Sequence, residues 1–232
     1  MKKFIFALSM LPACALAEPP IDSIYTADPN NGPRGIVIVP SSKIANPPLV
    51  TANLMEQKTK GYVYTEKNNA LAIMKDNKNI EINDINDPTD THMKSDMSKI
   101  KLGFKFNPIS FINPIGYAVG GTYIKDKGWT AIYSFFNDKE LGSCSFKVNS
   151  MALSHGAVII AKDTIEYLVN DKISSIYVEG SPKTGFVYTV TWDTNDYNYL
   201  LECANTKYDA AISFKMIQMA KKIDTAGNGL AS

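Results

Sequence analysis

The chain has 232 residues, of which 24 are basic and 23 acidic, so its formal net charge is +1. A near-neutral chain without a basic run offers no electrostatic attraction for nucleic acid, which we therefore do not expect as a partner. Hydrophobic residues make up 45% of the chain, and a chain of this length buries a core without help.

The first seventeen residues, MKKFIFALSMLPACALA, have the layout of a bacterial secretory signal peptide. Lys2 and Lys3 precede a short apolar run, and small residues end at Ala17. This layout predicts cleavage before Glu18, and the apolar run is too short to span a bilayer as a helix. We therefore expect a periplasmic or secreted protein, in a compartment where disulfides form.

An alternative within the same segment concerns Cys14. The run from Leu11 to Cys14, LPAC, resembles the lipobox that precedes a lipid-modified cysteine in bacterial lipoproteins, although Pro12 departs from that pattern. Lipidation at Cys14 would anchor the protein to a membrane surface. Cleavage after Ala17 would instead remove Cys14 with the signal.

Residues 18–60 are expected to form an irregular, extended arm. Seven of the twelve prolines lie here, and proline fixes φ and removes a backbone donor. The apolar run GIVIV at 35–39 is the exception and could add a strand to a sheet. The arm would serve either as a tether or as a segment that docks on a neighbouring subunit.

Residues 61–101 are expected to hold two short strands, within 61–74, followed by a polar linker over 76–101. The linker carries the acidic residues Asp84, Asp87 and Asp90. A calcium loop needs a glycine at its sharp turn and a closing glutamate, and this run has neither.

The segment 104–123, FKFNPISFINPIGYAVGGTY, is apolar and is interrupted by two Asn-Pro-Ile repeats. Asn-Pro favours turns, so the segment is expected to cover one end of the core. If it is exposed instead, Phe111 and Tyr117 would belong to a contact surface for protein or lipid.

From Trp129 onward, a series of short runs shows the period of two that is the signal of β-strands. Most of these runs alternate apolar with polar residues, while 129–136 is apolar on both faces. The expected strands cover 129–136, 143–149, 157–161, 165–169, 176–178, 186–192 and 197–203. A helix follows: Asp209 can cap it, and apolar residues from Ile212 to Ile223 recur at helical spacing.

These patterns predict an α+β fold. It consists of an antiparallel β-sheet or sandwich of six to eight strands over 102–224, one packed C-terminal helix, and a frayed tail at 225–232. Cys144 and Cys203 are the two cysteines left after the signal, and both fall on the apolar side of their strands. We expect them to form a disulfide that ties together the two ends of the strand meander; two separate buried thiols are the alternative.

Few residues point to chemistry. The two histidines, His92 and His155, stand at no metal-binding spacing, and no nucleophile elbow or phosphate loop is present. Carboxylates lie in or near the expected sheet at Glu166, Glu179, Asp193 and Glu202, where each could serve catalysis or simply face solvent. We therefore predict no catalytic residue, no metal and no cofactor.

Tyr197 and Tyr199 follow an Asp/Asn-rich turn and are candidates for a binding rim, together with Phe111 and Tyr117. The leading hypothesis is a non-enzymatic envelope protein that binds other envelope proteins as an accessory assembly component. One alternative is a β domain that binds a small ligand or a glycan, and another is a carboxylate-dependent hydrolase. Contact with a membrane is expected only if Cys14 carries a lipid.

Overall fold

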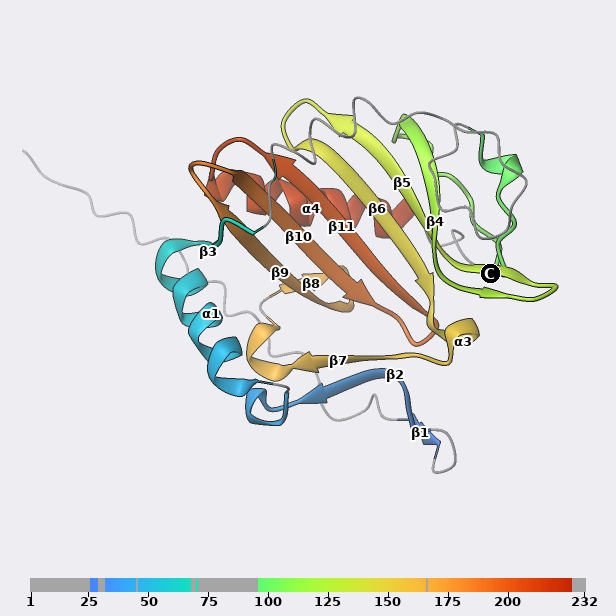
Figure 1. The fold of residues 1–232 in the computed structure, drawn as a ribbon, viewed down its shortest axis with the longest axis horizontal. Coiled ribbons are helices and arrows are strands. Elements are labelled where there is room, and N and C mark those ends of the chain that lie inside the picture. Colours follow the sequence, from blue (N-terminus) through green and yellow to red (C-terminus); the bar gives the residue numbers. More distant parts are fainter. Residues whose placement is uncertain are drawn as a thin grey trace, which may run out of the picture.

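Figure 1 presents a computed structural model, which describes residues 26–28, 32–44, 46–67, 70, 96–165 and 167–226. The strands are β1 (Thr26–Asp28), β2 (Gly32–Val39), β3 (Val63–Tyr64), β4 (Pro114–Ile124), β5 (Gly128–Asp138), β6 (Gly142–Ser150), β7 (Ala157–Ala161), β8 (Tyr167–Val169), β9 (Lys172–Ser181), β10 (Gly185–Asp193) and β11 (Tyr197–Asn205). The helices are α1 (Pro47–Lys60), α3 (Met151–Ser154) and α4 (Ala210–Ala226), with 3-10 turns at Ser41–Lys43, Met97–Lys99 and Lys162–Thr164.

The main sheet has eight strands in the order β3-β9-β10-β11-β6-β5-β4, with β8 paired to the outer edge of β9. Two antiparallel ladders, β4–β5–β6 and β9–β10–β11, join where β11 pairs with β6. The β3–β9 pair alone among the described pairs of this sheet is parallel. The sheet and the C-terminal helix confirm the predicted α+β class.

The strands do not follow one another as a simple meander. After β6 the chain leaves the main sheet, contributes β7 to a second sheet and returns through β8, so that β11 takes the free edge of β6. Alternation along a sequence identifies a strand but not its partner, so the predicted meander, in which consecutive strands pair, is wrong at this point.

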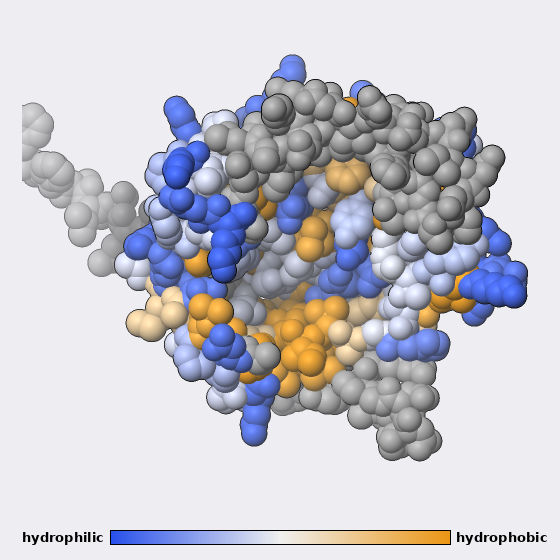
Figure 2. Space-filling model, viewed as in Figure 1, coloured by the Kyte–Doolittle hydropathy of each residue, from blue (hydrophilic) through white to orange (hydrophobic). Residues whose placement is uncertain are grey.

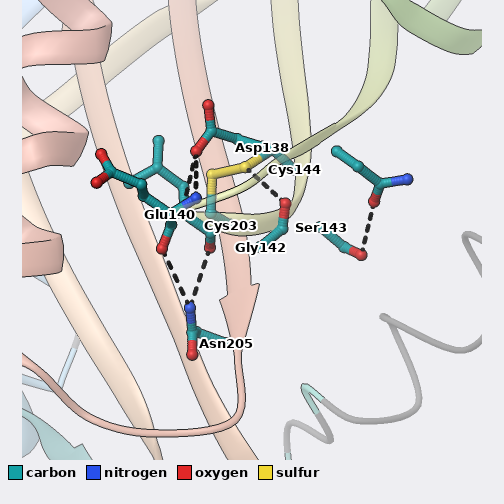
Figure 3. The surroundings of a disulfide bond; sticks show 9 residues. Asp138, Glu140, Gly142, Ser143, Cys144, Cys203 and Asn205 are labelled. Carbon is teal, nitrogen blue, oxygen red and sulfur yellow. Dashed lines mark hydrogen bonds between the residues drawn. A yellow bond between two sulfur atoms is a disulfide. The ribbon is translucent and has the colours of Figure 1, made fainter.

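The predicted disulfide between Cys144 and Cys203 is present, and Figure 3 shows its surroundings. The two residues face each other directly across the β6–β11 ladder, with Cα atoms 4.1 Å apart. Both are buried, at 1% and 0% exposure. The bond therefore joins neighbouring strands, rather than the two distant ends of a meander.

The turn between β5 and β6 packs beside this bond. Asp138 Oδ1 accepts the backbone N–H groups of Glu140 and Leu141 at 2.8 and 2.9 Å. Asn205 Nδ2 donates to the carbonyl oxygens of the same two residues, each at 3.5 Å. The tight turn and the last residue of β11 are thus fastened to each other (Figure 3).

Helix α4 covers one face of the main sheet and lies behind it in Figure 1. Asp209 caps the helix as predicted, because its Oδ1 accepts the N–H of Ala211 at 2.8 Å. Apolar side chains spaced three and four residues apart on α4 pack against alternate residues of the strands, which is the arrangement that buries an amphipathic helix. The buried core includes Ile212, Met216, Ala220 and Ile223 of α4 with Tyr188, Val190, Trp192, Phe146 and Leu201 of the sheet.

The second sheet has the order β1-β2-β7, and β2 runs parallel to β7. The strand predicted from GIVIV is therefore present in β2. Its Gly35 adopts φ 75° and lies close to the carbonyl oxygen of Asn195, so the small sheet rests near the β10–β11 turn. Of the two short strands expected within 61–74, β3 is present, and the second falls outside the described residues.

The extended arm predicted for 18–60 is wrong over Pro47–Lys60, which is the helix α1. Pro47 and Pro48 occupy its first turn, where a missing N–H costs nothing because that group would have no partner inside the helix. Gly61 ends the helix with φ 85° and donates its N–H to Gln57 O. The same prolines that suggested an extended chain thus mark a helix start.

The segment 104–123 mostly covers the core, as the first of its two interpretations predicted. Phe106, Ile109 and Ile112 are buried in the core, while Phe111 and Ile115 are 48% and 36% exposed.

Candidate functional site

The residues predicted as a binding rim do not form one surface. Tyr117 and Tyr199 are buried in the core, at 7% and 8% exposure, so this part of the prediction is wrong. Tyr197 lies between Phe104 and Tyr199, with ring centroids 5.8 and 6.2 Å away. The apolar sides of these strands face α4, and alternation alone does not say which face a helix will cover.

The other predicted site residues fall elsewhere. Phe111 lines a surface cavity with Lys221 and Lys222 near the end of α4. His155 is a turn residue with φ 51°, as expected. Cys14 and His92 lie outside the described residues.

The opposite face of the main sheet carries the most distinctive arrangement of side chains. The strand register places ten residues in two rows across β9, β10, β11, β6 and β5, and all ten are partly buried. The first row is Tyr177, Thr189, Glu202, Ser145 and Phe135, and the second is Ser175, Thr191, Leu200, Lys147 and Tyr133. We refer to these ten residues as the floor.

Figure 2 shows that this face of the molecule is hollowed. Apolar side chains border the hollow on the lower side, where Figure 1 places β2 and β7, and α1 stands at the side of β9. Every floor residue is partly buried, and two of them, Ser175 and Tyr177, line a cavity beside α1. The ten residues lie on the sheet face that Figure 2 shows as hollowed.

Aromatic rings form one end of the floor. Tyr133 and Phe135 lie parallel, with centroids 6.3 Å apart, and the Lys147 Nζ lies 5.3 Å from the centroid of the Tyr133 ring. The Tyr133 ring also occupies the space beside Gly120 of β4, where a Cβ would come within 2.6 Å of it. Gly120 therefore lets the ring lie close to the neighbouring strand.

Hydroxyl groups and α1 form the other end. Ser175 Oγ and Thr191 Oγ1 are hydrogen-bonded at 2.8 Å, and Asn53 Nδ2 donates to Tyr177 OH at 3.5 Å. Leu54 and Gln57 of α1 line a cavity of about 130 Å³ with Ser175 and Tyr177. Helix α1 is thus the wall of the hollow on the β9 side.

Carboxylates give the hollow an acidic character. Burial raises the pKa of Glu202, and the nearby Glu179 raises it further; burial also raises the pKa of Glu179. Burial and then the charges of Glu179 and Glu56 raise the pKa of Tyr177. These groups lose part of their hydration in the folded chain, so a ligand that binds them replaces less water.

Asp193 lies on the same side of β10, one row beyond Thr191, and is only 3% exposed. Burial raises its pKa to about 6, although Asn198 Nδ2 donates a hydrogen bond to Oδ1 at 2.7 Å. The sequence predicted that Asp193, Glu179 and Glu202 lie in or near the sheet. It did not predict that they share one face of it. Glu166 lies outside the described residues.

Sequence reasoning missed Tyr133, Lys147 and Tyr177. The polar half of the alternation in 143–149 is the signal that could have found Lys147. Tyr133 and Tyr177 lie in strands with apolar residues on both faces, so alternation gives no signal for them. Their shared surface depends on the β11–β6 pairing, which joins the two ladders into one face.

Within the described ranges, no group of three His, Cys, Asp or Glu side chains could hold a metal ion. The acidic cluster of Asp84, Asp87 and Asp90 lies outside those ranges. No helix in the same part of the chain is long and apolar enough to cross a membrane. The disulfide fits a protein that resides outside the cytoplasm.

Comparison with known proteins gives no relative: no protein-family model, no curated protein and no solved structure matches this chain.

Proposed function

We propose that this chain is an exported, non-enzymatic binding protein and that its hollow takes a polyhydroxylated ligand such as a glycan. The observation that carries the proposal is the floor: ten partly buried side chains in two rows on the face that α4 does not cover. A concave surface with convergent polar groups beside aromatic rings is the usual form of a ligand site.

The chemistry of the floor suits sugars. The hydroxyls of Ser145, Thr189 and Ser175 can both donate and accept hydrogen bonds, and the Glu202 carboxylate accepts them. The faces of Tyr133 and Phe135 offer apolar area on which the C–H side of a sugar ring can pack. One small region thus offers partners for the hydroxyl groups of a sugar and for the C–H face of its ring.

Export supports the same proposal. The signal-peptide layout and the disulfide favour a periplasmic or secreted protein, where envelope or environmental glycans are at hand. If Cys14 carries a lipid instead, the same domain would work while anchored to a membrane surface.

A protein partner is the competing proposal within the binding class. The expectation that the arm of residues 18–60 docks on a neighbouring subunit favoured a protein partner. In the structure, however, α1 hydrogen-bonds to β9 of its own chain and β2 pairs with its own β7. The exposed Phe111 is the feature that continues to favour it. Co-purification from detergent-solubilised envelopes would yield a stoichiometric partner if this proposal is right.

A hydrolase is the second candidate, because Glu179 and Glu202 share one face and burial raises the pKa of both. A carboxyl group with a raised pKa can act as a general acid near neutral pH. Release of reducing ends from a glycan that binds would favour this candidate, and loss of that release in Glu202→Gln would assign the acid.

Binding is tested by titrating the chain from Glu18 onward with cellotetraose and with tetra-N-acetylchitotetraose, in a calorimeter. Glu202→Gln and Thr189→Val keep the shape of the floor but remove a charge or a hydroxyl. We expect each to weaken binding by about tenfold or more, because each leaves a ligand hydroxyl without its partner.

The matched controls are Glu140→Gln and Thr206→Val, which alter exposed residues in turns. They should bind as the unmodified chain does. Absence of binding to either tetrasaccharide, or equal binding by floor and control variants, would contradict the proposal.

A further inference from the structure

Helix α1 is attached to the main sheet in an unusual way. None of its fourteen residues is buried, and Leu49 and Met55 are 54% and 65% exposed. A surface helix ordinarily buries an apolar stripe against the protein. The stripe of α1 that faces the sheet consists of Val50, Asn53, Leu54 and Gln57. Two of these four side chains, Asn53 and Gln57, are polar amides.

Hydrogen bonds from Gln57 provide the main attachment. Its Nε2 donates to Ile176 O at 2.8 Å, and its Oε1 accepts the N–H of Val178 at 3.1 Å. The side-chain amide thereby pairs with β9 as a neighbouring strand would, in the gap between the β8 and β3 pairings. The weaker contact of Asn53 with Tyr177 OH, at 3.5 Å, is the second polar contact of the stripe with β9.

Cavities lie on both sides of this attachment. One of about 280 Å³ is lined by Gln57, Gly61, Val178 and residues at the start of α4, and another of about 130 Å³ is lined by Gln57, Leu54 and Tyr177. Close packing is what normally makes a helix inseparable from its sheet. Between α1 and β9 that packing is incomplete.

The ends of α1 allow it to rotate as a unit. Asn46 and Gly61 flank the helix with φ 55° and 85°, so the chain changes direction sharply at each end. Hinges are commonly a few residues at the ends of an element. Rotation about these two positions would leave the ladders of the main sheet unchanged.

We propose that α1 is a strap that detaches from β9 while the main sheet stays folded, and that its opening widens the hollow beside Ser175 and Tyr177. The Gln57 hydrogen bonds hold the closed state. What the open strap admits rests on the function proposed above, but the motion itself does not depend on any ligand.

The test measures the access of a thiol reagent to a cysteine placed behind the strap. Val178→Cys introduces a free thiol at a position that is 2% exposed and lines the larger cavity beside Gln57, and Cys144 and Cys203 are bonded to each other. We expect N-ethylmaleimide to label it through an opening that urea does not accelerate below the unfolding transition, as local openings behave. Adding Gln57→Ala should raise the labelling rate by about fivefold or more.

Two controls separate the strap from general loosening. Ser145→Cys lies on the floor away from α1, and Gln57→Ala should leave its labelling rate unchanged; Gln218→Ala, on the exposed side of α4, should change neither rate. Hydrogen exchange of the α1 amides should accelerate in Gln57→Ala while that of β10 and β11 does not.

Labelling of Val178→Cys at the rate and with the urea dependence of global unfolding would overturn the proposal, and so would equal acceleration of Ser145→Cys by Gln57→Ala. The labelling experiment uses no ligand, so a failure to bind glycans would not contradict the strap proposal. If the labelling results contradict the strap proposal, the glycan-binding proposal is still tested independently by calorimetry.

Discussion

Burial of the Asp193 carboxyl group lowers the free energy of unfolding when the group is ionised. Its pKa is about 6 in the folded chain, and desolvation is the main cause. The unfolded chain has the ordinary aspartate pKa of about 3.9. The difference corresponds to about 3 kcal/mol of unfolding free energy, since each tenfold change in the proton equilibrium is about 1.4 kcal/mol.

The direction of the pH effect follows from which state releases its proton first. Below about pH 4 both states are protonated, and Asp193 has no effect. Between about pH 4 and pH 6 the unfolded chain ionises while the folded chain keeps the proton, so stability falls as pH rises. Above pH 6 the loss is complete.

Asp193→Asn removes this titration and keeps an oxygen that can accept the Asn198 hydrogen bond. We expect the variant to match the unmodified chain near pH 4 and to exceed it by up to about 3 kcal/mol at pH 7.5, or about 6–12 °C in Tm. Thermal melts followed by circular dichroism from pH 4 to pH 8 measure the difference.

Asp126→Asn is the matched control, because Asp126 is exposed and has φ 67°, a conformation that asparagine tolerates. Its Tm should follow that of the unmodified chain at every pH. A gain from Asp193→Asn that is the same at pH 4 and pH 7.5, or a loss at pH 7.5, would refute the reasoning.

Two further predictions concern stability. Replacing Cys144 and Cys203 together by alanine should cost about 4 kcal/mol, the loop-closure entropy for the 59-residue separation, and should lower Tm by about 8–16 °C; an unchanged Tm in a fully reduced sample with two titratable thiols would contradict this. Gly61→Ala should destabilise by more than about 1 kcal/mol, because φ is 85° there and the Tyr208 ring occupies the Cβ position. Urea melts measure the second effect, and Gly156→Ala, where φ is not positive, is its control.

The Gly61 prediction also bears on α1. If Gly61→Ala moves the helix without unfolding the sheet, the loss should show in the exchange of α1 amides before it shows in the core. A variant that loses core protection to the same extent would mean that α1 and the sheet unfold together.

The local features of this fold could be predicted from the sequence. Alternation identified β6, β10 and β11, because the period of two is a property of one strand and needs no partner. Helical spacing and Asp209 identified α4 for the same reason. Cys144 and Cys203, the two cysteines outside the expected signal segment, predicted the disulfide, because an even number of cysteines in a chain expected to be exported favours pairing.

The start of α1 was within reach of the sequence but was missed. Pro47 and Pro48 followed by a run without glycine, ended by Gly61, is also a helix signal. The density of prolines upstream outweighed it, although the first turn of a helix tolerates proline as well as an extended chain does.

The sequence by itself determined where strands and the last helix lie, because hydrophobic periodicity is a local property of each segment. Only the tertiary structure decided that β11 pairs with β6, which set Cys144 directly opposite Cys203 and merged two ladders into one floor. Only the tertiary structure decided, too, that α4 covers the face of Tyr199 and leaves Tyr133 and Glu202 in the hollow. Both faces of the main sheet carry aromatic residues, with Tyr133 and Tyr177 on one face and Tyr199 on the other. The choice between the two faces depends on contacts between segments far apart in the chain.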